Sequence, residues 1–290
     1  MSALNSLLPI ALAIIMLGLG LSLTAADFRR VLEQPRSVVV ALVCQVLLLP
    51  AVCFGLAIGF GLIPELAVGL MLLAASPGGS IANIFSHLSN GDVALNITLT
   101  AVNSLLSLLT LPIVVNLSLA YFMGEGRDVP LQPAKILQVF AFVLIPVAVG
   151  MAVRRRWPII ASRMDRPVRW ISVVVLALMF ALVFVSAREA VMTHLTTVGL
   201  VVLIFNILSL TVGYAISRAA KLGKPQAIAI AFEVGIHNAA LAITIALSPL
   251  LLANPTMAIP PMIYGLTMVV TAIGFGLMVN RHRRPHDRCP

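Results

Sequence analysis

The sequence predicts an all-α polytopic membrane protein with nine transmembrane helices. Hydrophobic residues make up 60% and charged residues 10% of the 290 positions, and the mean hydropathy is +1.08. An average soluble domain carries about 25% charged residues, so a soluble core could not accommodate this composition. Each spanning helix needs roughly 20 apolar residues. Nine such helices use the whole chain, 1–290, as a single transmembrane domain with no separate soluble part.

Nine apolar runs, joined by short connections, are the predicted helices. Their approximate bounds are Ala3–Thr24, Ser37–Leu62, Leu66–Phe85, Val93–Phe122, Ala134–Val153, Pro167–Ser186, Thr196–Ser217, Gln226–Leu252 and Thr256–Val279. Because Met1–Asn5 carry no basic stretch and no cleavage site follows, we expect the first run to be a retained helix rather than a signal peptide.

The basic residues predict the orientation in the bilayer. All but three of the 19 lie in connections on one side, and the exceptions are Arg127, Lys135 and Arg188. The positive-inside rule then places the C-terminus in the cytoplasm and the N-terminus outside, with Trp157 and Trp170 as interface anchors flanking the largest cytoplasmic loop. We expect a bacterial inner membrane. The same placement argues for the lipid bilayer, and against nucleic acid, as a partner of the basic residues.

Two of the runs contain helix-breaking residues near their centres. The third holds Ser76–Ser80, with Pro77, Gly78 and Gly79, and the eighth holds Glu233–Asn238. Non-helical backbone survives at membrane depth only where protein or a water-filled cavity satisfies it. The breaks lie five helices apart, which predicts two inverted repeats, helices 1–4 and 6–9, with two broken helices that cross at a transporter binding site. The alternative is two ordinary kinks, since Gly and Pro are frequent in membrane helices.

Glu233 is the one acidic residue of the ten that we expect deep in the bilayer. No Lys or Arg is expected at that depth, so a bound cation or protonation must compensate the carboxylate. Asn83 follows the first break, and Asn96, Thr100, Asn103 and Ser107 share one face of the fourth helix. Their oxygens suit a hard cation such as sodium. The alternative use of such a stripe is hydrogen bonding between membrane helices.

The breaks also offer a site for an anion. Half-helices beginning near Gly79–Ser80 and near His237–Asn238 would direct free N–H groups and positive dipole ends towards the midplane, which suits a carboxylate. His237 is the only histidine expected at membrane depth. It is either a neutral, hydrogen-bonded core residue or a titrating group that affects coupling. The three cysteines form no CxxC pair, so neither a metal site nor a redox role follows from them.

Four stretches of the chain resemble the bile acid:sodium symporter family, including bacterial homologues of the apical sodium-dependent bile acid transporter. They are Ile14–Leu23 with Asp27-Phe28, Ser76–Ser80 through Asn83, Asn90–Leu95 and Glu233–Asn238. The resemblance implies a core domain of helices at about 37–122 and 196–279, and a panel domain of helices at about 3–24 and 134–186.

The resemblance also implies two sodium sites. The first comprises the carbonyl of Ala82 and the side chains of Asn83, Asn96, Thr100 and Glu233. The second comprises Gln45, Glu233, the backbone of Val234 and Ile236, and His237. A histidine offers nitrogen where the family usually has the amide of glutamine. The chain could therefore bind one or two sodium ions, or a proton could replace the second.

We therefore expect a secondary active transporter that takes up a small or amphipathic organic anion with sodium by alternating access, with Gly79, Ser80 and Asn238 bordering the substrate. The alternative is a sodium-independent or proton-coupled organic anion transporter or facilitator. An intramembrane enzyme is disfavoured because no GxSxG, HExxH or paired intramembrane Asp is present. We expect a monomer without an organic cofactor. The sequence does not identify the substrate, which could be a bile acid, a keto acid or another carboxylate.

Overall fold

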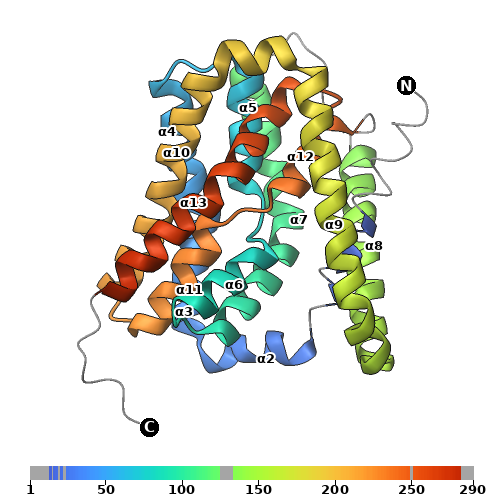
Figure 1. Cartoon of the computed structure of the whole chain (residues 1–290), viewed down its shortest axis with the longest axis vertical. Coiled ribbons are helices and arrows are strands. Elements are labelled where there is room, and N and C mark those ends of the chain that lie inside the picture. Colours follow the sequence, from blue (N-terminus) through green and yellow to red (C-terminus); the bar gives the residue numbers. More distant parts are fainter. Residues whose placement is uncertain are drawn as a thin grey trace.

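The computed structural model describes residues 13, 14, 16–18, 20, 21, 24–124, 133–248 and 251–281, and these residues form helices without any strand. Most of the predicted first helix, Ala3–Thr24, lies outside them, as do Arg127 and the tail after residue 281. Figure 1 shows the helices as a bundle running between two ends of the molecule. Their bounds are α2 Ala25–Glu33, α3 Pro35–Val43, η1 Cys44–Leu48, α4 Leu49–Gly59, α5 Pro64–Ala75, α6 Ser80–Leu88, α7 Val93–Met123, α8 Pro133–Arg156, α9 Pro158–Ser186, α10 Arg188–Ala219, α11 Lys224–Gly235, α12 Ala239–Leu247, η2 Thr256–Ala258 and α13 Ile259–Arg281.

Apolar side chains cover much of the outside of the bundle, as expected for a protein in lipid. On α7, for example, Leu109, Ile113, Leu117 and Tyr121 recur every four residues, and each is more than half exposed. By length and composition, the described residues contain three helices able to cross a membrane, namely 35–59, 188–219 and 256–280, or four if the bent α7 is one span. The chain is therefore an integral membrane protein, while nine spanning helices remain a prediction.

Several predicted boundaries were wrong where basic residues were taken for a loop. Instead of a long connection up to Pro167, α8 continues to Arg156 and α9 begins at Pro158, so that Trp157 alone separates the two helices. Arginine has a high helix propensity, and a proline is well tolerated in the first turn of a helix. The basic residues therefore extend the helices beyond their apolar segments.

Two helices depart from regular α geometry near the centre of the bundle. The chain from α3 to α4 passes through one π-helical turn, Cys44–Leu48, directly before Pro50, which cannot donate a backbone hydrogen bond to Val46. Helix α7 bends by 53° between Ser107 and Leu109. Its Pro112 cannot donate to the carbonyl of Leu108, which accounts for a bend at this place. The two distortions shape the pocket described below.

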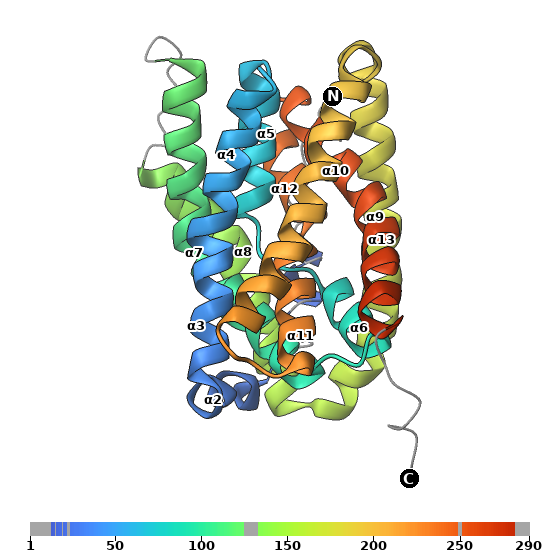
Figure 2. The same ribbon diagram turned by 90° about the vertical axis from the view of Figure 1, so that its left-hand side faces the viewer.

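A polar cluster, which we call the three-helix clasp, joins the N-termini of α3, α7 and α11. Asp92 caps α7 by accepting from the Leu95 N–H at 2.9 Å, and it accepts from the Gln34 amide at 3.2 Å. Gln34 in turn accepts from Gln226 at 2.8 Å, and the Asp92 N–H donates to the Pro225 carbonyl at 2.9 Å. Figure 2 shows these helix ends near one another at one end of the bundle.

Replacing Asp92 by Ala should destabilise the protein, because it removes a helix cap and the hydrogen bond from Gln34. We expect a loss of about 1–3 kcal/mol in the free energy of unfolding, from the typical cost of a lost cap and of a lost hydrogen bond to a charged group. Denaturation of the detergent-solubilised protein with SDS measures it. Glu33→Ala, an exposed position on α2, is the matched control, and equal stabilities of the two variants would contradict the role of the clasp.

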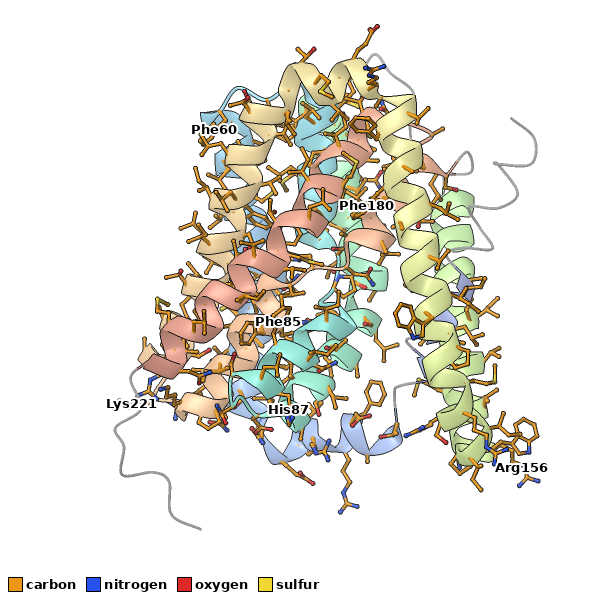
Figure 3. The ribbon with its side chains drawn as sticks, in the orientation of Figure 1. Phe60, Phe85, His87, Arg156, Phe180 and Lys221 are labelled. Carbon is orange, nitrogen blue, oxygen red and sulfur yellow. The ribbon has the colours of Figure 1, made fainter. Side chains whose placement is uncertain are left out.

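The ends of the helices give a test of the predicted orientation. Figure 3 shows Arg156 and Lys221 at one end of the bundle and Phe60 at the opposite end. In a cysteine-free background, a membrane-impermeant maleimide should label Phe60→Cys in intact cells, and should label Arg156→Cys and Lys221→Cys only after permeabilisation. Labelling of Arg156→Cys and Lys221→Cys from opposite sides would contradict both the topology and the fold.

Candidate functional site

Two broken helices cross at the centre of the molecule, as predicted. The non-helical residues are Ser76–Gly79 between α5 and α6, and 236–238 between α11 and α12, so each break begins and ends within three residues of the expected segment. Gly78 and His237 form an antiparallel bridge. The Gly79 N–H donates to the Ile236 carbonyl at 3.0 Å, and the Asn238 N–H donates to the Pro77 carbonyl at 2.9 Å. Each break thus satisfies backbone groups that the other leaves free.

Amide side chains from neighbouring helices hold the carbonyls freed at the ends of α5 and α11. Gln45, in the π-helical turn, donates to the Ser76 carbonyl at 3.0 Å. Asn206 of α10 donates to the Gly235 carbonyl at 2.8 Å, and the hydroxyl of Tyr264 on α13 donates to the same carbonyl at 2.7 Å. The breaks are therefore fixed from several sides and are not mobile gaps in the helices.

Glu233, in the last turn of α11, is fully buried beside the first break. The Thr100 hydroxyl donates to its Oε2 at 2.6 Å, and the Asn103 amide donates to its Oε1 at 3.1 Å. In the part of the chain that the structure describes, no Lys or Arg forms an ion pair with this carboxylate. Two neutral donors leave the charge itself uncompensated, and a buried charge is costly unless it is paired.

Gly78 allows the carboxylate to approach the bridge. A methyl group built on Gly78 would overlap all three atoms of the Glu233 carboxyl group. The glycine therefore lets the negative charge lie directly against the backbone of the opposite break. This contact links the two interrupted helices through the charged group itself.

Four buried amide oxygens on the π-helical turn, α6 and α7 have no hydrogen-bond partner. They belong to Gln45, Asn83, Asn96 and Asn103. The Asn96 nitrogen donates to the Ala229 carbonyl at 2.6 Å, which orients its oxygen away from that contact. Since nearly all buried polar atoms in proteins are paired, a group of unpaired oxygens requires an explanation. Oxygen is the ligand that hard cations prefer.

His237 lies between aromatic rings. Its ring stacks on Phe205 at a centroid distance of 5.4 Å and meets the edge of Tyr264 at 5.4 Å. Nδ1 is 3.2 Å from the Ser76 carbonyl, which assigns a proton to Nδ1, and the buried Nε2 has no partner. The Gln45 amide nitrogen lies 3.4 Å from Nδ1.

Comparison with known proteins identifies the family. Residues 9–194 match the sodium bile acid symporter family. The chain belongs to this family.

Relatives of this symporter family member span most of its length. An uncharacterised sodium-dependent transporter of Bacillus subtilis, YocS, is 29% identical over 261 residues, which cover 90% of this chain and 78% of the relative. The human ileal sodium/bile acid cotransporter is 26% identical over 83% of this chain and 69% of its own. A probable chloroplastic sodium/metabolite cotransporter of rice, BASS2, is 28% identical over 93% of this chain and 62% of its own. The family and the names of these relatives indicate transport, not enzymatic catalysis.

The structure brings most of the predicted sodium-site residues together around the crossing. Thr100 contacts Glu233, Gln45 contacts the first break, and the carbonyl of Ile236 takes part in the bridge. Ala82 on α6 and Val234 on α11 are buried, and each lies within a few residues of a break in the sequence. Neither contacts the Glu233 carboxylate through a hydrogen bond of the described residues. Asn83 and Asn96 supply unpaired oxygens.

The predicted substrate residues lie where α6 and α12 begin. Gly79 precedes α6, whose N-terminus has no side-chain cap, whereas the side chain of Asn238 caps α12 by accepting from the Leu241 N–H at 3.0 Å. Ser80 is the first residue of α6, and its side chain lies outside the described part of the structure. The oxygen of Asn238 is thus already occupied.

Sequence reasoning missed the group formed by Asn206, Tyr264 and Thr271. The Thr271 hydroxyl donates to the Asn206 oxygen, and the Asn206 nitrogen also donates to the Tyr264 hydroxyl at 2.8 Å. A lone asparagine inside an apolar run was the available signal. It could not be paired with a freed carbonyl without knowing that α10 packs against α11.

Gly78→Ala should displace the Glu233 carboxylate from Thr100 and Asn103. We expect a loss of about 1–3 kcal/mol in stability, the usual cost of leaving buried polar groups unpaired, and a loss of any stabilisation by sodium. Thermal unfolding in sodium and in choline measures both effects. Gly55→Ala is the matched control, since a methyl group there meets no atom within 4 Å. Equal behaviour of the two variants would contradict the contact.

Proposed function

We propose that this protein is a secondary active transporter that carries a small or amphipathic organic carboxylate inward together with sodium, by alternating access. One observation carries the proposal. A fully buried carboxylate, Glu233, accepts from two neutral donors and has no basic partner among the described residues, and the amide of one donor, Asn103, also carries an unpaired oxygen. Such a group has the composition of a cation site.

The two sodium positions share Glu233. We propose that the first is formed by the carbonyl of Ala82 and the side chains of Asn83, Asn96, Thr100 and Glu233. The second is formed by Gln45, Glu233 and the backbone of Val234 and Ile236, next to His237. The C-terminal ends of α5 and α11 lie next to the breaks, and their partial negative charge favours a cation there.

The substrate carboxylate is held at the N-terminus of a helix, where the dipole is positive. Helix α6 begins at the crossing without a side-chain cap, so the positive end of its dipole is open to an anion. Gly79 and Ser80 form this end, and Asn238 lies at the start of α12 close to the bridge. The family's named substrates, bile acids and other metabolites in the relatives, include amphipathic acids of the kind that such a site accommodates.

Coupling follows from the shared geometry. Sodium binding neutralises Glu233 and draws the amide oxygens of α7 towards α11, so the crossing acquires its final geometry only when the cation is present. The helix end that holds the substrate belongs to the same crossing. Substrate affinity and sodium affinity then depend on each other reciprocally.

Alternating access requires two groups of helices that move relative to each other. We propose that the first helix, α8 and α9 form the panel domain and that the helices at about 37–122 and 196–279 form the core domain. Helices 1–4 and 6–9 of the predicted nine form two inverted repeats. The reciprocal hydrogen bonds between residues 77–79 and 236–238 support this symmetry, because a two-fold axis through the bridge exchanges one bond with the other. We further propose a monomer in a bacterial inner membrane, with a cytoplasmic C-terminus.

Proton coupling is the alternative favoured by a specific observation, the unpaired Nε2 of the buried His237. A histidine in this position could accept the proton that replaces the second sodium ion. In that case uptake should depend on an imposed pH gradient, and His237→Gln should remove this dependence. Uptake that depends on neither sodium nor pH would identify a facilitator.

Glu233→Gln is the direct test of sodium coupling. The amide cannot neutralise a cation, so sodium should no longer raise the thermal unfolding temperature, while in choline the variant should be at least as stable as the wild type because a buried charge has been removed. Sodium-dependent uptake of organic acids should be lost. Glu33→Gln, at an exposed position, is the control. Sodium-dependent uptake that persists in Glu233→Gln would refute the proposal.

A further inference from the structure

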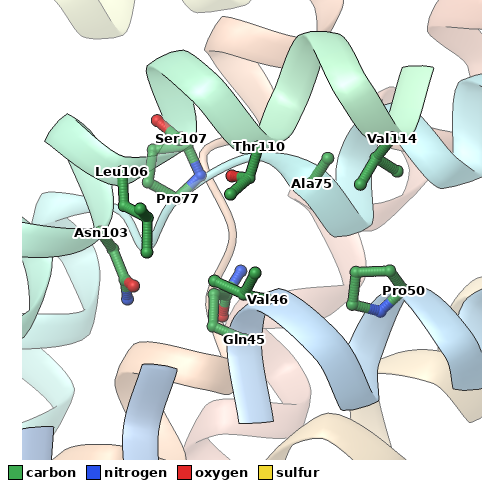
Figure 4. Close-up of a pocket in the computed structure, with 10 residues that line it drawn as sticks. All are labelled: Gln45, Val46, Pro50, Ala75, Pro77, Asn103, Leu106, Ser107, Thr110 and Val114. Atoms are coloured by element: carbon green, nitrogen blue, oxygen red, sulfur yellow. The ribbon is translucent and has the colours of Figure 1, made fainter. Parts of the chain in front are cut away.

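A pocket opens between the distorted stretches of two helices, next to the candidate cation site. It is lined by residues of α3–α4, of the first break and of the bend in α7, as Figure 4 shows: Gln45, Val46, Pro50, Ala75, Pro77, Asn103, Leu106, Ser107, Thr110 and Val114. Its enclosed volume is about 10 Å³. A cavity needs roughly 10–15 Å³ to hold one water molecule, so this pocket suits a water molecule or a small ion rather than the organic anion.

Two of the lining residues have buried carbonyl oxygens without a partner. Gln45 is 5% exposed and Asn103 is 2% exposed, and neither Oε1 of Gln45 nor Oδ1 of Asn103 accepts a hydrogen bond. In both residues the nitrogen is fixed elsewhere, in Gln45 by the Ser76 carbonyl and in Asn103 by Oε1 of Glu233. The nitrogens therefore determine which atom of each amide is left, and in both residues it is an oxygen.

Glu233 connects the two amides to a negative charge. The Asn103 nitrogen donates to the carboxylate, so the oxygen of the same amide group is held close to the charge. Gln45 approaches from the other wall of the pocket, through the break that packs on the same carboxylate. Two unpaired oxygens line one pocket, and one of them belongs to a residue that donates to the uncompensated carboxylate. These are the components of a cation position, since a structural hydrogen-bond network would pair the oxygens.

His237 contributes no oxygen to this place. Its Nδ1 is directed at the Ser76 carbonyl, and its ring is packed between Phe205 and Tyr264. A cation beside Gln45 therefore needs a further oxygen from another helix. Asn103 on α7 is the residue whose unpaired oxygen shares the pocket with Gln45.

We propose that Asn103 is a cation ligand, and that its carbonyl oxygen and that of Gln45 bind one sodium ion together with Glu233. This inference rests on the proposed sodium coupling and adds to it a ligand from α7. It restores the oxygen that the histidine at position 237 does not supply, and so gives this chain a complete second ion position.

The test measures sodium-induced thermal stabilisation of the full-length protein in detergent, with choline replacing sodium at constant ionic strength. The variants are Asn103→Leu, Gln45→Leu and the double variant. Each single variant should raise the sodium midpoint by about tenfold or more, the lower end of the effect that losing even an outer-shell partner has on a metal site. The Hill coefficient should fall from about two to about one. Because both oxygens bind one ion, the double variant should show no further loss, so the effects are not additive.

Ser104→Ala, which removes a buried hydroxyl from the same helix, should leave the sodium midpoint and the Hill coefficient unchanged. Where Asn103→Leu does not fold, Asn103→Ser provides a smaller change that keeps an oxygen further from the ion and should give an intermediate midpoint. An unchanged midpoint in a folded Asn103 variant would overturn the proposal, as would fully additive effects, which are expected if the pocket holds only water. Wild-type protein that sodium does not stabilise would instead refute the sodium coupling itself.

Discussion

The buried carboxylate of Glu233 is the constraint on which the rest of the core depends. A charge at this depth needs a partner of opposite sign or a proton, and no Lys or Arg of the described helices forms an ion pair with it. The surrounding residues are arranged to tolerate the charge. Thr100 and Asn103 donate to it, and Gly78 gives it space against the opposite break.

The crossing of two broken helices supplies what a continuous helix could not. Each interrupted helix exposes backbone carbonyls at one half and N–H groups at the other, so positive and negative dipole ends meet at one depth. Gln45 donates to a freed carbonyl of the first break, and Asn206 and Tyr264 both donate to a freed carbonyl of the second. These hydrogen bonds stabilise the non-helical conformation of the breaks. Side chains far apart in the sequence thus maintain an arrangement that would otherwise close into ordinary helices.

The sequence was informative where one residue type has few physical solutions. Pro77 beside two glycines predicted a break, and the lone acidic residue of the eighth apolar run, Glu233, predicted a buried carboxylate, because neither is tolerated at membrane depth without compensation. It was less informative where contacts between helices decide. Asn103 belonged to the predicted polar stripe, but its contact with Glu233 depends on how α7 packs against α11. The π-helical turn that carries Gln45 has no distinctive sequence pattern beyond a proline, and the extra turns of α8 and α9 lie in charged residues that resemble a loop.

The three-helix clasp has a mechanical consequence for the ions. It ties together the N-termini of the three helices that carry Gln45, Asn103 and Glu233. At about 1.5 Å of rise per residue, these side chains lie roughly 10–16 Å along their helices from the tie. When helices are held together at one end, a small change in the angle between them produces a larger displacement further along. The separation of the oxygens therefore changes more than the helix ends do. The affinity of the proposed cation site would thereby be set partly by residues that never approach it.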